Sequence, residues 1–325
     1  MRKALFLLFL SSALPSFAQT AKEKGLSAIT KENAMKHIAV LAHDSLDGRE
    51  AGTSGGLKAS YYLRSEFEET SIKPWRGKYF QSFSESPHGR NSNKKPNMQN
   101  ILGYIEGKNN TEIVIVGAHY DHLGIRGNGT NDNIYNGADD NATGTSAILQ
   151  IAKAFVASGE KPGRTIIFAL WDGEEIGLLG SFYFVKDHAS YIPIPLSAPP
   201  VIRGYVNLDM IGRNNNEVAD SILHVKCTIA ESKPVFKDWI KEDIDNHNLE
   251  LNPEYVYLEK ESRRMNSDHA PFFFKGIPII YYNTGLHQDY HQVSDHADKI
   301  NYEKVAAISK LAFLNVWNMA NIKDY

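Results

Sequence analysis

One stretch, residues 113–144, limits most strongly what this chain can fold into. It begins with a hydrophobic run, Ile113–Val116, that leads straight into Gly-Ala-His119-Tyr-Asp121. A polar, glycine-rich segment then separates this tip from Gly-Ala-Asp139-Asp140-Asn-Ala-Thr-Gly. A short apolar run bounded by polar residues is typical of a buried strand. The stretch therefore predicts a histidine and carboxylates at the tip of a strand, which is what a divalent metal site needs.

Three more strand-like runs lead to acidic residues or a histidine. These lie in the segments Trp-Asp-Gly-Glu174-Glu175, Asn-Leu-Asp209-Met and Tyr-His291-Gln. The expected strands alternate with expected helices, an order typical of a mostly parallel sheet covered by helices on both faces. In such folds ligands bind beyond the carboxyl ends of the strands. We therefore expect an α/β fold with these tips at one edge of its sheet.

The expected elements cover most of the chain. Helices are expected at about 25–42, 57–69, 144–157, 176–187, 233–246 and 301–320. Strands are expected at about 79–83, 100–107, 113–118, 165–171, 201–208, 221–226 and 277–282. No internal repeat is evident, and the four prolines of residues 193–200 indicate a loop rather than a domain boundary. A single domain is expected over residues 19–325.

The first 18 residues have the layout of a cleavable secretory signal peptide. Arg2-Lys3 precede an apolar run over residues 4–14, and Ser16-Phe17-Ala18 place small residues before a cleavage point. The run is too short to span a bilayer. We expect cleavage near Ala18 and export to the periplasm or the medium; a buried N-terminal helix is the alternative interpretation.

Composition excludes several classes of function. The chain has 325 residues, 42% of them apolar, and a formal charge of −3, so no basic surface for nucleic acid is expected. No other apolar stretch approaches the roughly 18 residues of a membrane span. Cys227 is the only cysteine, so no intramolecular disulfide is available. Stability is expected from a large core, to which bound metal would add.

Each polar tip has an ordinary structural explanation when taken alone. A lone histidine at a strand end is usually a satisfied polar residue. Glu174-Glu175 would also favour a helix N-terminus, and Asp139-Asp140 would also cap the helix that follows. Together, however, so many carboxylates at one sheet edge are costly unless a cation neutralises them. Two histidines and several carboxylates, without cysteine, suit Zn²⁺ in an open catalytic site.

The supply of ligands predicts two zinc ions per chain. Two ions about 3.5–4 Å apart need about six protein bonds, with one carboxylate shared between them. The expected ligands are His119, Asp139, Glu175, Asp209 and His291, with Asp139 as the shared one. Glu174 is then free to act as general base on a water molecule. Asp121 is placed to orient the imidazole of His119.

These segments, together with Ser267-Asp268-His269, resemble the co-catalytic di-zinc aminopeptidases of metallopeptidase family 28, in clan MH. The match runs in order from about residue 35 to the C-terminus. The resemblance implies a phosphorylase/hydrolase-like three-layer fold with a central mixed sheet of about eight strands. It also implies hydrolysis of the first peptide bond of peptides with a free N-terminus, with Glu174 as the base.

The resemblance also implies how the ligands are shared out. Glu175 and His291 would hold one ion and His119 and Asp209 the other, and a cis peptide would follow the bridging Asp139. One position departs from the family: a tyrosine that helps hold the oxyanion is replaced by Arg264, which could supply the same polarisation or leave the role absent. The expected substrate-pocket residues are Arg264, Ser267, Asp268 and Tyr290.

The other histidines are expected to have lesser roles. His269 and His287 are candidates for lining the site, whereas surface or packing positions are expected for His122, His188, His224, His247 and His296. Two other functions remain open. A glutaminyl cyclase would share the fold but hold one zinc and lack the counterpart of His119. A non-catalytic ectodomain would have lost ligands or the base, and all are present here.

Overall fold

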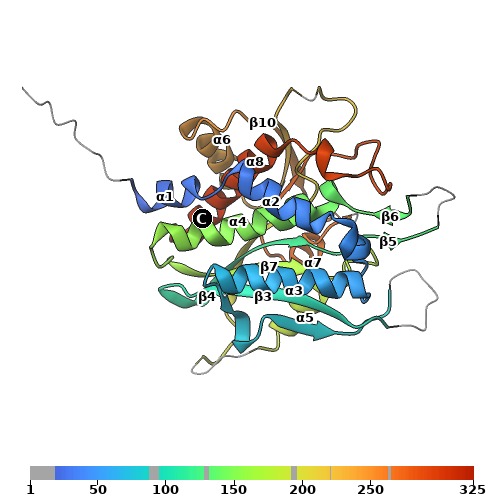
Figure 1. Cartoon of the computed structure of the whole chain (residues 1–325). Coiled ribbons are helices and arrows are strands. Elements are labelled where there is room, and N and C mark those ends of the chain that lie inside the picture. The colour runs from blue at the N-terminus through green and yellow to red at the C-terminus, as the bar shows by residue number, and fades with distance from the viewer. Residues whose placement is uncertain (1–18, 88–94, 128–131, 192–195, 220, 263–264) are drawn as a thin grey trace, which may run out of the picture.

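A computed structural model describes residues 19–325 except 88–94, 128–131, 192–195, 220 and 263–264 (Figure 1). The expected signal peptide and Arg264 lie outside the described residues. The strands are β1 (Lys73–Pro74), β2 (Phe80–Phe83), β3 (Met98–Ile105), β4 (Asn109–His119), β5 (Gly124–Ile125), β6 (Ile134–Tyr135), β7 (Arg164–Trp171), β8 (Val201–Leu208), β9 (His224–Ala230), β10 (Asn252–Leu258) and β11 (Ile279–Asn283). The α-helices are α1 (Ala21–Ser27), α2 (Lys31–Leu41), α3 (Ser54–Glu69), α4 (Gly144–Ser158), α5 (Leu179–His188), α6 (Val235–Asn246), α7 (Ala270–Phe274) and α8 (Tyr302–Asn321).

Nine strands form one mixed sheet in the order β1-β3-β7-β4-β8-β11-β9-β10, with β2 also paired to β3. The four central strands, β7, β4, β8 and β11, run parallel to one another. Their carboxyl ends therefore meet at one edge of the sheet. The mixed α/β sheet expected from the sequence is confirmed.

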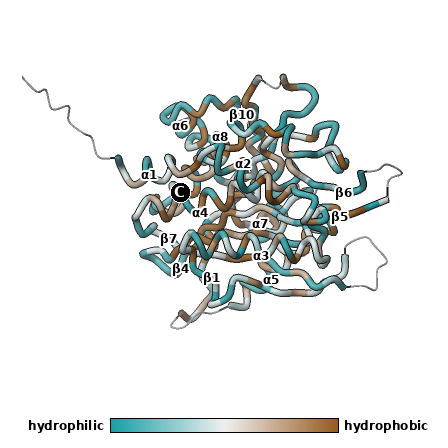
Figure 2. The backbone as a smooth tube through the Cα atoms, viewed as in Figure 1, coloured by the Kyte–Doolittle hydropathy of each residue, from teal (hydrophilic) through white to brown (hydrophobic). Residues whose placement is uncertain are grey.

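Helices cover both faces of the sheet because the central strands are apolar on both sides. In β4, Val114 and Val116 pack into the core cluster that includes α4 and α8. The alternate residues, Ile113 and Ile115, pack on the opposite face with Phe184 of α5. Figure 2 shows the hydrophobic colouring concentrated along these central elements and the hydrophilic colouring along outer loops.

Several elements differ from the expected ones; among them, the strand expected at 221–226 is β9 at His224–Ala230, and the short strands β1, β5 and β6 were not expected. The helix expected at 25–42 is two helices, because Thr30 caps α2 by accepting a hydrogen bond from the Asn33 amide (3.2 Å). Strand β10, at the sheet edge, was not expected, since its proline, glutamate and half-exposed pattern hide its strand character. The short helix α7 was also missed.

The helix expected from residue 176 begins instead at Leu179. The backbone amides of Gly177 and Leu178 both donate to the carbonyl of Glu174, at 2.9 Å each, and form a turn before α5. This turn holds the glutamate pair at the end of β7. Within the part of the chain that the structure describes, no helix has both the length and the apolar character that a membrane crossing requires.

Candidate metal centre

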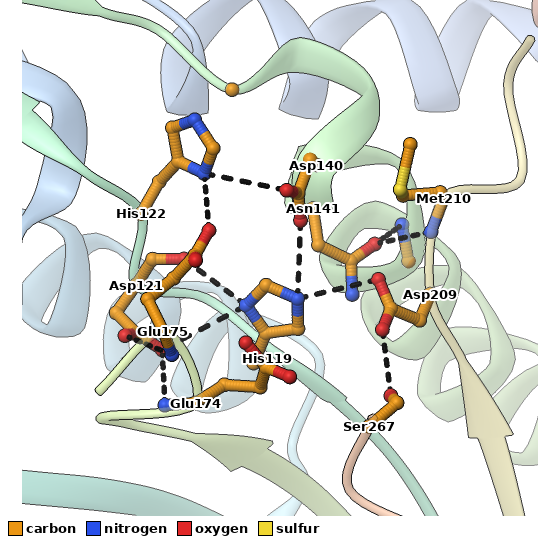
Figure 3. A network of polar contacts seen from close by, with 12 residues as sticks. His119, Asp121, His122, Asp140, Asn141, Glu174, Glu175, Asp209, Met210 and Ser267 are labelled. Atoms are coloured by element: carbon orange, nitrogen blue, oxygen red, sulfur yellow. Dashed lines mark hydrogen bonds and ion pairs between the residues drawn. The ribbon is translucent and has the colours of Figure 1, made fainter. Parts of the chain in front are cut away.

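Five chain segments bring acids and histidines together at the carboxyl edge of the sheet, and residues from most of them are labelled in Figure 3. His119 is the last residue of β4, Asp209 follows β8, and the glutamate pair follows β7. The turn before α4 adds Asp140, and the loop after β11 adds His291. The parallel direction of the central strands accounts for this gathering.

One group of side chains forms around His119. Its Nε2 lies 3.3 Å from Oδ1 of Asp209 and 3.3 Å from Oδ1 of Asp140. Glu174 belongs to the same group, because its carboxylate and the nearest atoms of His119 and Asp209 all lie within 4.8 Å of one another. The imidazole is buried, with 1% of its side chain exposed.

A second group forms around His291. Its Nε2 lies 3.2 Å from Oδ2 of Asp140 and 3.1 Å from Oε2 of Glu175. The structure thus brings together His119 with Asp209, and Glu175 with His291, as the resemblance implied. Asp140 belongs to both groups, since each of its carboxylate oxygens faces a different imidazole.

The structure corrects the expected position of the shared carboxylate from Asp139 to Asp140. Oδ1 of Asp139 accepts a hydrogen bond from the Gly212 amide (2.6 Å), and its Oδ2 lies 3.1 Å from Nε2 of His287. Asp139 therefore points away from the two groups, and His287 supports it.

The backbone explains why neighbouring aspartates point in different directions. The amides of Asp139 and Asp140 both donate to the carboxylate of Asp295, at 3.0–3.1 Å, which fixes the turn between them. The non-proline cis peptide joins Asp140 to Asn141, one position later than the resemblance implied. Asn141 in turn donates to the Leu208 carbonyl (3.0 Å) and ties this turn to the end of β8.

Asp121 lies against both groups, but its contacts differ from those expected. Its carboxylate accepts hydrogen bonds from the amides of Glu174 (3.1 Å) and Glu175 (3.3 Å). Nδ1 of His119 lies 3.1 Å from the backbone carbonyl of Asp121 and 3.7 Å from its carboxylate. Asp121 therefore fixes the glutamate pair with its side chain and the imidazole with its backbone.

Three of the expected pocket residues adjoin the site. Ser267 donates its hydroxyl proton to Oδ2 of Asp209 (2.6 Å) and supports that carboxylate. Asp268 is fully buried, and burial raises its pKa to about 7. The ring of Tyr290 stacks on His291 with centroids 3.8 Å apart.

The crowded carboxylates shape the electrostatics. Burial raises the pKa of Glu174 well above its ordinary value; His119 opposes this rise, and nearby acids including Glu175 and Asp209 add to it. Burial opposes the charged form of His291, but Asp140 and Glu175 outweigh it and raise the His291 pKa to about 10. The buried carboxylates of the site therefore stabilise any positive charge placed among them, whether on an imidazole or on a bound cation.

Arg49 is a buried cation that holds the backbone segments on either side of the site. It is inaccessible to solvent and donates to the carbonyls of Tyr120 (2.8 Å), Asn136 (2.6 Å), Gly137 (2.9 Å) and Leu41 (2.5 Å). These bonds join the end of β4 to the loop that leads to Asp140. No feature of the sequence predicted a role for Arg49.

His122 was also missed. It was expected at the surface or in packing, but 1% of the residue is exposed and Nδ1 lies 2.8 Å from Oε1 of Glu175. The available signal was its position in the same strand-end segment as His119.

The donor set fits zinc. Two ligand atoms bound tetrahedrally to one zinc at about 2.0–2.1 Å lie about 3.3–3.4 Å apart. The distances from His119 to Asp140 and Asp209, and from His291 to Asp140 and Glu175, are 3.1–3.3 Å. Imidazole nitrogens and carboxylate oxygens are ordinary zinc ligands. Ligand-like spacing therefore occurs in both groups.

Residues 100–316, more than half of the chain, match the sequence model of peptidase family M28. The chain belongs to peptidase family M28. This M28 chain is 29% identical over 231 residues to Aminopeptidase YwaD of Bacillus subtilis, a match that covers 67% of the chain and 44% of that relative. The chain spans less than half the length of the curated relatives it matches.

Solved structures share the fold of this M28 chain. The LapA aminopeptidase of Legionella pneumophila superposes with a TM-score of 0.72 at 21% identity, covering 99% of this chain and 81% of that one. A glutaminyl cyclase of Fimbriiglobus ruber superposes with a TM-score of 0.68 at 18% identity, covering 89% and 95%. At these identities the likeness concerns the fold alone.

Proposed function

We propose that this M28 chain is a zinc-dependent aminopeptidase that hydrolyses the first peptide bond of peptides. The observation that carries the proposal is Asp140, whose two oxygens face His119 on one side and His291 on the other. One carboxylate between two ligand groups is the arrangement of a two-ion centre. The aminopeptidase among the relatives favours the same activity.

The proposed ligands form two sets that share Asp140. His119 and Asp209 belong to one set, and Glu175 and His291 to the other. Zinc bound there would lower the pKa of water and polarise the carbonyl of the scissile bond.

Glu174 is the proposed general base. Its carboxylate lies in the His119 group, and its backbone amide is held by the carboxylate of Asp121. Burial raises its pKa, so the carboxylate takes up a proton readily. In the proposed reaction it accepts the proton of the attacking water and returns it to the leaving amine.

Two further features support a substrate with a free N-terminus. The acids of the site attract an α-ammonium group. A cavity of about 550 Å³ begins at Met210, the residue after Asp209, and is also lined by Asn266, His269 and Tyr281. We propose that this cavity receives the side chain of the N-terminal residue of the peptide substrate.

The protein's own first 18 residues, which have the layout of a signal peptide, support its export.

The test is hydrolysis of a panel of aminoacyl and dipeptidyl chromogenic substrates by the zinc-loaded protein. Aminoacyl compounds should be cleaved, and Glu174→Gln should keep its zinc but lower kcat by at least about 100-fold, because proton transfer is lost. Glu106→Gln, at a half-exposed ion pair with Lys161, is the matched control. Cleavage of dipeptidyl compounds alone would overturn the aminopeptidase proposal, and near-full activity of Glu174→Gln would overturn the role of the base.

A further inference from the structure

His291 differs from the other proposed ligands because it lies in a loop, between β11 and α8, and not at the end of a strand. Its backbone φ is 57°, in the left-handed region that residues other than glycine rarely adopt. Such a conformation is costly and persists only where the surrounding structure holds it in place. The contacts made by its neighbours in the loop therefore determine where the imidazole lies.

Asp289, two residues before His291, is held by three side chains. Its Oδ2 pairs with Nη1 of Arg213 (2.5 Å), and its Oδ1 pairs with Nζ of Lys299 (2.9 Å). Oδ1 also accepts the hydroxyl proton of Ser294 (2.5 Å). Only 8% of the Asp289 side chain is exposed, so solvent and salt screen these ion pairs weakly.

Arg213 is a fixed partner for this carboxylate, because the chain before it is bonded to the turn that carries Asp140. Three successive amides donate to side chains of that turn: Met210 to Asn141 (3.2 Å), Ile211 to Thr143 (3.2 Å) and Gly212 to Asp139 (2.6 Å). The carbonyl of Arg213 also accepts a hydrogen bond from the buried ammonium group of Lys304 (2.9 Å). The ion pair therefore ties the His291 loop to the segment that follows Asp209.

The backbone of Asp289 adds a second connection to the same turn. Its amide donates to Nδ1 of His287 (3.2 Å), and Nε2 of that histidine lies 3.1 Å from Oδ2 of Asp139. The side chain and the backbone of Asp289 thus connect the loop to the turn at two points. The position of His291 relative to Asp140 therefore depends on Asp289.

We propose that Asp289 is a positioning residue that holds His291 in place as a metal ligand. Its ion pairs with Arg213 and Lys299 fix the loop so that the imidazole stays 3.2 Å from the shared Asp140. Asp289 itself binds no metal and takes no part in proton transfer. This inference rests on the proposed two-ion function.

The two metal positions should depend on Asp289 unequally. His119 ends β4 and Asp209 directly follows β8, so the sheet itself places these two ligands. His291 depends on its loop. Loss of the Asp289 carboxylate should therefore weaken the position that contains His291 by about 10–100-fold, the loss typical when a contact that supports a ligand is removed. The affinity of the position that contains His119 should change little.

The first test is zinc affinity by chelator competition in Asp289→Asn. Asp187→Asn is the matched control, since Asp187 forms an ion pair of the same length with Arg76 (2.5 Å) in the last turn of α5. Both variants should lose stability, because each leaves a partly buried arginine without its carboxylate. Only Asp289→Asn should lose zinc affinity, and at one position. Two unchanged zinc affinities in Asp289→Asn would overturn the proposal and leave the proposed function intact.

The partner residue gives an independent variant. Arg213→Gln keeps the pair between Asp289 and Lys299, and it should weaken the same zinc position. Combined with Asp289→Asn, it should cost less than the product of the two single losses, because both variants remove one contact. Losses that multiply would overturn the proposal. If Asp289→Asn does not fold, unchanged zinc affinities in Arg213→Gln would overturn it.

The weakened position is identified with ¹¹³Cd²⁺ as the probe in protein labelled with [¹⁵N]histidine. In the wild type, one-bond coupling between ¹⁵N and ¹¹³Cd should appear for His119 and His291. At a concentration that just fills both positions of the wild type, Asp289→Asn should keep the coupling at His119 and lose it at His291. Loss at His119 as well would indicate general loosening and overturn the positioning role. Absence of metal binding in the wild type would overturn the proposed function too.

Discussion

At the scale of single residues, the pair Asp139 and Asp140 separates what sequence can and cannot predict. The sequence predicted that this segment supplies a shared carboxylate, because two acids stand between a strand end and a helix. Which of the two faces the site depends on Asp295, whose carboxylate accepts both amides from more than 150 residues away. A contact of that range leaves no mark in the local pattern.

The two aspartates give a paired prediction. Asp140→Asn should lose zinc and activity, because one neutral amide cannot serve two cations as a carboxylate does. Asp139→Asn should keep its zinc but lose about 1–3 kcal/mol of stability, because Asp139 accepts the Gly212 amide and contacts His287. Zinc content and thermal unfolding of both variants check this. Equal zinc loss in the two would contradict the assignment.

His122 and Arg49 were missed for a related reason. A histidine or an arginine in a polar loop is usually exposed, and nothing in the local spacing marks these as buried. Their roles depend on the packing of the N-terminal loop against the end of β4, where the Arg49 carbonyl accepts the His122 amide. By contrast, His119, Glu174 and Asp209 follow strongly apolar strands, so their positions could be predicted.

At the scale of elements, the hydrophobic pattern predicted the central strands well and the edges poorly. Strands β4 and β7 are buried along most of their length, so they appear as continuous apolar runs. Strand β10 is half-exposed and carries Pro253, so it lacks that signal. The site lies at the ends of the central strands, which is why its location could be predicted.

The contact between α6 and α8 contains a buried acid with a predicted pH effect. Asp243 of α6 accepts hydrogen bonds from Asn315 (2.8 Å) and Asn318 (3.0 Å) of α8. Burial raises its pKa to about 6, although Lys22 and the two amides oppose the rise. An unfolded aspartate has a pKa of about 3.9. The folded state therefore binds the proton more tightly, and this group makes stability fall as pH rises from about 4 to 6.

Asp243→Asn should remove that dependence. Relative to the wild type, the variant should gain stability as pH rises from 4 to 7, by about 1–2 kcal/mol after solvent screening. Urea unfolding of both proteins over this range, at equal metal loading, measures the difference. A relative stability that decreases with rising pH would contradict the assigned pKa shift.

At the scale of the whole molecule, the order of strands and helices places every proposed ligand at one edge of the sheet. The sequence predicted this class of fold and the chemistry of the site, because both follow from runs of apolar residues and the polar tips that end them. Which of Asp139 and Asp140 faces the site, and the burial of Arg49 and His122 beside it, follow from tertiary contacts. The central claim is that the assembled edge holds two ions that share Asp140.

Zinc content per chain, determined by elemental analysis of the purified protein, tests that claim most directly. Two sets of ligands joined by one carboxylate predict a value near two. A value near one, as expected for a single-zinc glutaminyl cyclase, or a value near zero would contradict the two-ion centre.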